Sequence, residues 1–406
     1  MSPPEDHARA QAGFNRLRTW LLEEAAPLWS TAGVDADGLF EELIGLDGRP
    51  VSAPRRARVQ PRQLYALTVA RRLGASIDQA LLQRGLRAFL ARYVRSDGLV
   101  RTLIDADGRV LDDRAALYDQ AFVLLALANL RALVGPPAEA SAIALREAIF
   151  TAFRHADAGF WSMDPPPAEL LSNPHMHLLE ACLAWMEAGG DPQWAQAAEA
   201  IVRLALDRFI DPMCGGALKE FFADGWAPAM GQPGRVVEPG HQFEWAWLLL
   251  RWSRLASGRP HVLAARVAAM RLIRIGEERG VDPVRNVALN GLLDDFSRFD
   301  GEARLWPQTE RIKAWALAAS QVGGPWWDTV AMAIEGLELY LQTSTPGLWF
   351  DRMTVGGALV EAPAPASSFY HIVCAIETLG HALDEAARDG DEASSGPRAL
   401  PIQRTA

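Results

Sequence analysis

Apolar residues recur along most of the chain three and four positions apart, which is the spacing of one face of an α-helix. Capping residues and prolines mark where these segments begin. The pattern predicts twelve helices and an all-α fold, with helices near residues 7–28, 59–73, 77–93, 116–134, 139–154, 173–188, 192–208, 238–256, 260–275, 306–321, 325–341 and 367–385.

Alternate helices begin at intervals of about 60 residues, which is the length of one helical hairpin with its loop. Six such hairpins can stack as an open solenoid or close into a ring. Each repeat carries polar residues at the same place, which favours closure into an (α/α)6 barrel with six inner and six outer helices. No linker divides the chain, so residues 1–385 are predicted to form one domain, with a polar, disordered tail at 386–406.

Short β-like stretches with turn signals precede several of the inner helices. Asp-Gly pairs occur at residues 47–48, 107–108, 224–225 and 300–301, and the sequence VGGALV occupies 355–360. Asp-Gly is typical of tight hairpin turns. We therefore expect small β-hairpin loops at the end of the barrel where the inner helices begin.

A polar cluster lies at the start of each predicted inner helix. Four clusters contain proline near the first helical position, and Asn173 is a good N-cap, so these are N-terminal turns. Parallel inner helices would place all six at one end of the barrel, around one pocket. The clusters are VQPRQLY (59–65), LYDQAF (117–122), NPHMHLLEA (173–181), PGHQFEW (239–245), LWPQTE (305–310) and SSFYHI (367–372).

Four of the eight histidines lie in these clusters: His175, His177, His241 and His371. One histidine on an apolar helix is usually structural, but recurrence at the same structural position indicates a site. His241 and Glu244 are three residues apart and share a helix face. Arg62 and Arg304 are candidates to stabilise a developing oxyanion, although Arg304 equally suits an outward salt bridge.

Composition narrows the class of protein. The formal net charge is −10, which argues against a nucleic-acid-binding face. The three cysteines are widely spaced and odd in number, which favours a reducing compartment over a disulfide framework. The N-terminus lacks the pattern of a signal peptide, and no uncharged apolar run is long enough to span a bilayer. We expect a cytoplasmic protein without membrane or nucleic-acid partners.

Taken together, the six clusters resemble the N-acylglucosamine 2-epimerase family, which also includes cellobiose 2-epimerases and aldose–ketose isomerases acting on mannose. The resemblance runs from about residue 55 to 385 and implies an (α/α)6 barrel. NPHMHLLEA, PGHQFEWAWLL and SSFYHI look more like the mannose isomerase branch. The family is typically monomeric or dimeric and needs no cofactor or metal.

The resemblance also implies roles for individual residues. The catalytic acid/base residues are His241 and His371, with His177 assisting proton transfer or ring opening. The substrate-binding residues are Arg62, Tyr118, Asn173, Glu244, Trp306 and Glu310. His175 has no settled role in the family pattern.

Histidine suits the chemistry because imidazole is a base near neutral pH, and the C1 carbonyl of an open-chain aldose acidifies the C2 hydrogen. Return of the proton to C1 of the enediolate gives a ketose, and return to C2 from the opposite face gives the epimer. We expect a D-mannose/D-fructose isomerase; the alternative is a 2-epimerase on mannose, glucose, cellobiose or an N-acylglucosamine. The sequence has no Gly-rich phosphate loop, which favours an unphosphorylated sugar, although arginines at the mouth could bind phosphate.

Three other classes remain open from the residues. A metalloenzyme would recruit His175, His177, His241 and Glu244. A glycoside hydrolase would need two opposed carboxylates, from Glu244, Glu310 and Asp119. The third class is a non-catalytic sugar-binding protein.

Overall fold

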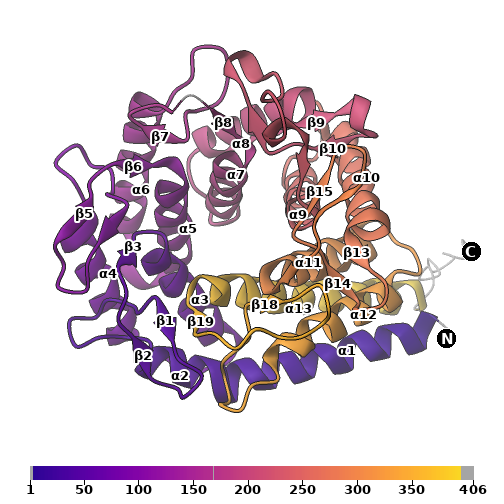
Figure 1. Ribbon diagram of the computed structural model, residues 1–406, viewed down its shortest axis with the longest axis horizontal. Helices are drawn as coiled ribbons and strands as arrows, with labels where there is room; N and C mark the ends of the chain where they lie inside the picture. Colours follow the sequence, from indigo (N-terminus) through magenta and orange to yellow (C-terminus); the bar gives the residue numbers. More distant parts are fainter. Residues whose placement is uncertain (1–2, 168, 395–406) are drawn as a thin grey trace, which may run out of the picture.

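The computed structural model describes residues 3–167 and 169–394, and each helix expected from the apolar pattern is present (Figure 1). Single π-helical or 3-10 turns join α1 to α2 and extend α8 and α12. The helices are α1 Pro3–Trp20, α2 Ala26–Thr31, α3 Val59–Leu73, α4 Gln79–Tyr93, α5 Leu117–Val134, α6 Pro136–Ala152, α7 Ser172–Glu187, α8 Pro192–Leu204, α9 Pro239–Leu255, α10 Val262–Gly280, α11 Leu305–Gln321, α12 Trp327–Glu338 and α13 Ser367–Ser394.

The helices form two concentric rings, which confirms the predicted (α/α)6 barrel. The inner ring contains α3, α5, α7, α9, α11 and α13, each in contact with the next, and α13 contacts α3 to close it. Outer helices α4, α6, α8, α10 and α12 each pack on the inner helix before them. The sixth outer helix is α1, which packs on α12 and α13; Arg9 bonds Asp328 at 2.6 Å and Arg16 bonds Glu338 at 2.8 Å.

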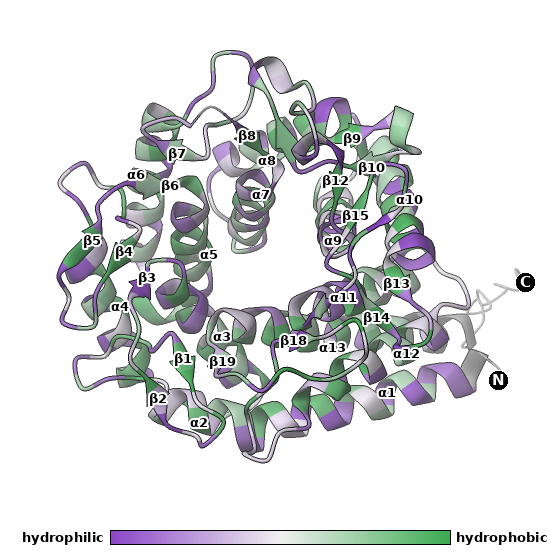
Figure 2. Ribbon diagram, in the orientation of Figure 1, coloured by the Kyte–Doolittle hydropathy of each residue, from purple (hydrophilic) through white to green (hydrophobic). Residues whose placement is uncertain are grey.

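Burial explains the composition of the two rings. α5 is long and apolar enough to cross a membrane by length and composition, but 67% of it is buried within the protein. A helix that is apolar on all sides belongs in an interior, here between the outer ring and the neighbouring inner helices. The outer helix α1 instead alternates hydrophilic and hydrophobic residues along its length (Figure 2).

Short antiparallel strands link the loops at the N-terminal ends of the inner helices. The strand before each inner helix pairs with a strand of the next loop around the ring: β3–β4, β6–β7, β8–β11, β12–β15, β17–β18 and finally β19–β1. The strands are β1 Leu43–Ile44, β2 Pro50–Val51, β3 Arg55–Arg56, β4 Leu103–Ile104, β5 Val110–Asp112, β6 Ala115–Ala116, β7 Met163–Asp164, β8 Leu170–Leu171, β9 Ile210–Asp211, β10 Ala217–Leu218, β11 Phe221–Phe222, β12 Val236–Val237, β13 Val281–Asp282, β14 Val287–Ala288, β15 Gly291–Leu293, β16 Arg298–Asp300, β17 Ala303–Arg304, β18 Arg352–Met353 and β19 Ala364–Pro365.

The predicted hairpin turns are present in part. Gly48 turns β1 into β2 and Gly108 turns β4 into β5, with φ of 78° and 84°. That region favours glycine because it has no Cβ. Asp224 and Gly225 lie in a 3-10 turn, Asp224–Trp226, at the tip of a further small hairpin, in which Phe222 and Pro228 form an antiparallel bridge.

A buried glutamine in the first turn of four inner helices fixes the loop from the preceding hairpin. In α3, the Phe40 N–H donates to Gln60 Oε1 and Gln60 Nε2 donates to the Phe40 carbonyl, both at 2.8 Å. We call this pair of bonds the amide clamp. It recurs between Gln120 and Val100, Gln242 and Leu218, and Gln308 and Ala288.

In α7 a histidine occupies the same position. The Phe160 N–H donates to His175 Nε2 at 2.9 Å, and His175 Nδ1 lies 2.9 Å from the Leu171 carbonyl. Burial lowers the pKa of His175 to about 4, so it is neutral and can accept at one nitrogen while donating at the other. His175 therefore has a structural role and leaves the set of candidate catalytic residues.

The C-terminus differs from the predicted boundary. α13 continues to Ser394, past residue 385, where the sequence predicted a disordered tail. The remainder of the predicted tail, residues 395–406, lies outside the described residues.

Gln60→Ala should lower the free energy of unfolding by about 2–4 kcal/mol, because both polar groups of buried Phe40 lose their partner. Urea denaturation measures this change. The control is Gln193→Ala, at an exposed glutamine of α8, with an expected change within about 0.5 kcal/mol. Equal effects of the two substitutions would contradict a structural role for the clamp.

Candidate active site

The N-terminal ends of the inner helices surround a cavity of about 420 Å³. It opens at the end of the barrel where the polar clusters were predicted to converge. Seven of the nine predicted site residues line it: Arg62, Tyr118, Asn173, His241, Glu244, Trp306 and His371. The other lining residues are Arg56, Arg58, Glu238, Arg304, Ser367 and Ser368.

Trp306 lies between the two histidines that were predicted to be catalytic. Its ring centroid is 5.0 Å from that of His241 and 5.7 Å from that of His371. His241 comes from α9 and His371 from α13, on the two sides of α11, which carries the tryptophan. Both imidazoles and the indole therefore face one small volume.

On the side away from the cavity, His371 contacts a buried ion pair. Its Nδ1 lies 2.8 Å from Glu310 Oε1, and Glu310 Oε2 lies 2.5 Å from Lys313 Nζ. Burial lowers the pKa of His371 well below its usual value, and the charges of Arg62 and Lys313 act in the same direction. With Glu310 accepting the Nδ1 proton, the neutral ring presents the Nε2 lone pair as a base.

Lys313 is the cation that faces Glu310: burial raises the pKa of this carboxyl, and the charge of Lys313 opposes that rise. Both side chains are completely buried, and the Lys313 ammonium also lies 3.7 Å from the centre of the Trp247 ring. Burial alone would lower the pKa of Lys313, but the surrounding carboxylates, including Glu310, raise it above its usual value. A buried charge needs such a partner, so this pair behaves as one unit.

His241 has the opposite environment. Its Nδ1 lies 2.9 Å from Glu220 Oε2 and 3.2 Å from Glu238 Oε2. Burial opposes a charge on the ring, but the two carboxylates overcome it and raise the pKa of His241 to about 10. His241 is therefore an imidazolium at neutral pH.

His177 lies beneath the cavity and does not line it. Its Nδ1 is 3.3 Å from Glu180 Oε2, and the Tyr370 hydroxyl donates to the same carboxylate at 2.5 Å. Burial lowers the pKa of His177 to about 4. The assisting role expected from the resemblance stays a prediction; His177 contacts Tyr118 and Glu244, which do line the cavity.

Glu310 also departs from its expected place. The resemblance implied a substrate-binding residue, but Glu310 is fully buried behind His371 and is absent from the cavity wall. The physical reason is its partners: the Glu310 carboxylate is engaged by His371 Nδ1 on α13 and by Lys313 on its own helix. Glu310 is thus a positioning residue for His371.

Glu244 and Arg62 supply hydrogen-bond donors to the cavity. Burial and the nearby charge of Glu310 raise the pKa of Glu244 well above its usual value, which favours the protonated form that can donate a hydrogen bond. Arg62 donates to the Tyr118 hydroxyl at 2.5 Å and to the Ser367 carbonyl at 3.4 Å, while its Nε has no hydrogen-bond partner among the described residues. Both groups can stabilise negative charge on a substrate oxygen.

Several groups of side chains have the composition of metal ligands. Glu220, Glu238 and His241 form one such group, and Glu244, Glu310 and His371 another, each with ligand atoms within 4.8 Å. In both groups the histidine nitrogen already faces a carboxylate. The four-residue set considered from the sequence is not assembled, because both nitrogens of His175 bond the loop backbone.

The glycoside hydrolase alternative loses its carboxylate pair in the structure. Of its three candidates only Glu244 lines the cavity, while Asp119 and Glu310 are fully buried. Among the described residues that line the cavity, the other carboxylate is Glu238, which is engaged with His241.

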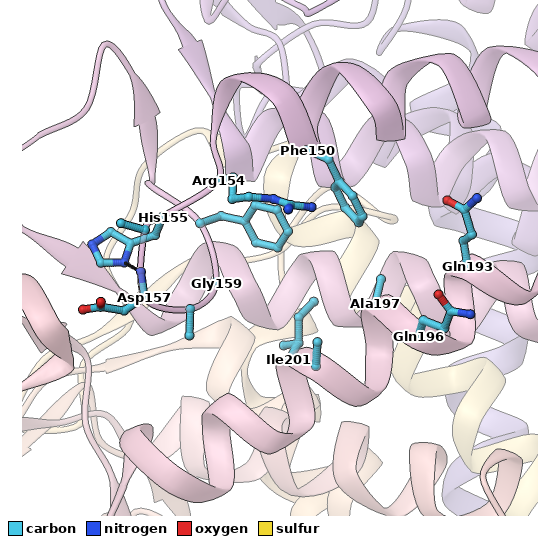
Figure 3. Close-up of a pocket in the computed structure, with 13 residues that line it drawn as sticks. Phe150, Arg154, His155, Asp157, Gly159, Gln193, Gln196, Ala197 and Ile201 are labelled. Carbon is cyan, nitrogen blue, oxygen red and sulfur yellow. Dashed lines mark hydrogen bonds between the residues drawn. The ribbon is translucent and has the colours of Figure 1, made fainter.

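A second cavity, of about 370 Å³, lies outside the ring axis between α6, α8 and the loop at 154–160 (Figure 3). Phe150, Arg154 and Ile201 contribute to its wall. The His155 Nε2 is 3.0 Å from Asp224 and its Nδ1 accepts the Asp157 N–H, so this histidine is already satisfied. None of the predicted site residues lies there.

The sequence profile of the N-acylglucosamine 2-epimerase family matches residues 38–375. The mannose-6-phosphate isomerase of Rhizobium meliloti (strain 1021) is 44% identical over 385 residues, which are 92% of this chain and 97% of that protein. The D-mannose isomerase of Thermobifida fusca is 28% identical over 366 residues, covering 83% and 87% of the two chains.

Two solved structures share the fold. A crystal structure of D-mannose isomerase superposes with a TM-score of 0.78 at 19% identity, covering 92% of this chain and 97% of that one. Cellobiose 2-epimerase from Bacillus thermoamylovorans B4167 gives 0.79 at 19% identity, covering 91% and 100%. Because the family profile spans most of the sequence and the fold agrees, the chain belongs to the N-acylglucosamine 2-epimerase family.

Proposed function

We propose that this enzyme interconverts D-mannose and D-fructose through a cis-enediolate, by histidine acid/base catalysis. The relatives described above are named for isomerisation of mannose or of its 6-phosphate. The substrate is a small sugar, as expected for the family. A cytoplasmic location and a monomeric or homodimeric state remain predictions of the sequence.

The observation that carries the proposal is the opposite protonation of two histidines facing one cavity. His371 is neutral, with its base nitrogen directed away from Glu310, whereas His241 is held as a cation by Glu220 and Glu238. When the surroundings lower the pKa of one group and raise that of another, the first is suited to act as the base and the second as the acid. His371 is therefore the base and His241 the acid.

The reaction balances with these groups alone. His241 first assists opening of the sugar ring by protonating the ring oxygen and is reprotonated as the C1 hydroxyl loses its proton. His371 Nε2 then removes the proton from C2, and the C2–H electrons form the double bond of the enediolate. Arg62 donates to its oxygens, and so does Glu244 in the protonated form that its raised pKa favours. During this step His241 gives its proton to the C1 oxygen and then takes the proton of the C2 hydroxyl, so it ends as the cation it began as. His371 returns its proton to C1 on the same face, and the C2 oxygen becomes the ketose carbonyl.

A 2-epimerase is the second candidate, favoured by the placement of both histidines against Trp306. Epimerisation requires a proton to reach C2 from the face opposite the base. His241 would have to give its proton to carbon rather than to oxygen. Its two carboxylate partners stabilise the cation, which favours the isomerase.

Incubating the enzyme with D-mannose in D2O, with EDTA present, should produce D-fructose carrying deuterium at C1. Proton NMR follows the product and the position of the label. Glucose labelled at C2 would instead establish the epimerase. His371→Ala should abolish exchange, whereas His381→Ala, at an exposed histidine of the same helix, should retain it.

Lys313→Met should lower kcat by roughly 10-fold or more with a smaller change in KM. Without the ammonium, Glu310 takes up a proton and its carboxyl O–H donates a hydrogen bond to His371 Nδ1. The neutral imidazole then carries its own proton on Nε2, so Nε2 can no longer act as the base. Steady-state kinetics measure the split between kcat and KM.

The control for this variant is Arg311→Met, which removes another buried cation of α11. Its partner Glu277 lies on α10, so this change should lower stability and leave kcat unaffected. Equal kcat losses in both variants would show that Lys313 acts only through folding.

Glu220→Gln should move the alkaline limb of the pH–kcat profile downward. Wild-type activity needs protonated His241 and is therefore lost as pH rises through about 10. Removing the Glu220 charge lowers that pKa, so the loss begins at lower pH. Glu302→Gln, at a half-exposed carboxylate 4.0 Å from Arg352, should leave the profile in place. An unchanged alkaline limb in Glu220→Gln would refute the assignment of His241 as acid.

A further inference from the structure

The carboxylate of Glu220 reaches His241 from a short loop that two inner helices hold at both ends. Loop residue Leu218 is bonded by the amide clamp of Gln242, which follows His241 on α9. Two residues later in the loop, the Ser172 N–H at the start of α7 donates to the Glu220 carbonyl at 3.1 Å. α7 and α9 are neighbours in the inner ring, so Glu220 lies at the boundary between them (Figure 1).

Ser172 also bonds the side chain of Glu220. Its hydroxyl donates to Glu220 Oε2 at 3.0 Å, and the same oxygen lies 2.9 Å from His241 Nδ1. The other oxygen, Oε1, is buried and has no hydrogen-bond partner among the described residues. The Ser172 hydroxyl therefore fixes which oxygen of this carboxylate faces the imidazole.

Burial makes this hydrogen bond hard to replace. The exposed fractions of Ser172, Glu220 and His241 are 0%, 3% and 6%. Water has little access to such a site, so a carboxylate that loses its donor there has to move toward another one. Serine at the start of a helix often caps a free backbone N–H, but the hydroxyl of Ser172, the first residue of α7, bonds Glu220 instead.

The other charged and titratable groups around His241 are held without the help of Ser172. Glu238, the residue before α9, lies 3.2 Å from His241 Nδ1. The remaining groups are Glu244 on α9, His177 on α7, and Arg304, whose charge acts on Glu238. Within the described part of the chain, the Ser172 side chain hydrogen-bonds none of them. A change at Ser172 therefore reaches His241 through Glu220.

We propose that Ser172 is a positioning residue: its hydroxyl holds the Glu220 carboxylate against His241 Nδ1 and thereby fixes the orientation of the imidazole in the cavity. His241 lines the cavity and Ser172 does not, so Ser172 acts without touching the substrate. A carboxylate partner at one ring nitrogen determines how a histidine presents the other. This inference rests on the proposed function, in which His241 is the acid.

Ser172→Ala should move the alkaline limb of the pH–kcat profile downward by about 0.5 pH unit or more. The freed carboxylate can turn away from His241 and then stabilises the imidazolium less, so activity is lost at lower pH than in the wild type. The shift should be smaller than that of Glu220→Gln, which removes the charge altogether. In the Glu220→Gln background, Ser172→Ala should cause no further shift, because the two residues act as one unit.

The matched control is Ser253→Ala. Ser253 is also buried, lies on the same helix as His241, and donates its hydroxyl to the Leu249 carbonyl at 2.7 Å. Its substitution should leave the alkaline limb in place. Circular dichroism across the pH range establishes that each variant stays folded.

An NMR titration of the His241 ring in the protein without sugar separates this inference from the proposed function. The pKa should be about 10 in the wild type and lower in Ser172→Ala. If no sugar is converted, the isomerase proposal fails, and this titration alone decides the role of Ser172. An unchanged or raised pKa in Ser172→Ala would overturn the inference. So would an equal decrease in Ser253→Ala, or a further decrease when Ser172→Ala is added to Glu220→Gln.

Discussion

The amide clamp is the interaction on which the geometry of the site depends. A buried glutamine in the first turn of α3, α5, α9 and α11 bonds both backbone groups of one loop residue. In α7, His175 takes this place but accepts only the N–H of its loop residue, Phe160. The clamp satisfies loop groups that the ring would otherwise bury unpaired. Loop and helix therefore form one rigid unit, and the side chains of the first turn are held in fixed positions around the ring axis.

The clamp fixes the position of side chains in the first two turns of each inner helix. The residue two positions after the clamp, such as Arg62, Glu244 or Glu310, contacts the cavity or a residue that lines it. Three residues further on, the side chains include Glu180 and Lys313, which are buried charges. Each needs a partner in the turn above, because an unpaired ion in the interior is costly. The buried charges of the lower turn thus shift the pKa values of their partners in the turn above.

Much of the fold followed from the sequence, because helix periodicity and capping are local. The predicted segment 59–73 coincides with α3, and most other ends fall within a few residues. Pairings between distant residues did not follow: Glu220 reaches His241 from a loop, and Tyr370 bonds Glu180 190 positions away. One usable signal was overlooked. Glutamine recurs at the same place in four clusters, and Lys313 lies one turn beyond Glu310 on the inward face.

The two histidines differ in what fixes their charge. His371 depends on Glu310 and Lys313, both on the inner helix α11, whereas His241 depends on Glu220, which lies between two short strands of a loop. The proposed base, His371, is therefore fixed by residues of the inner ring, whereas the pKa of the proposed acid, His241, depends on a loop residue. Inner helices that hold a neutral base suit any reaction that begins with removal of the C2 proton.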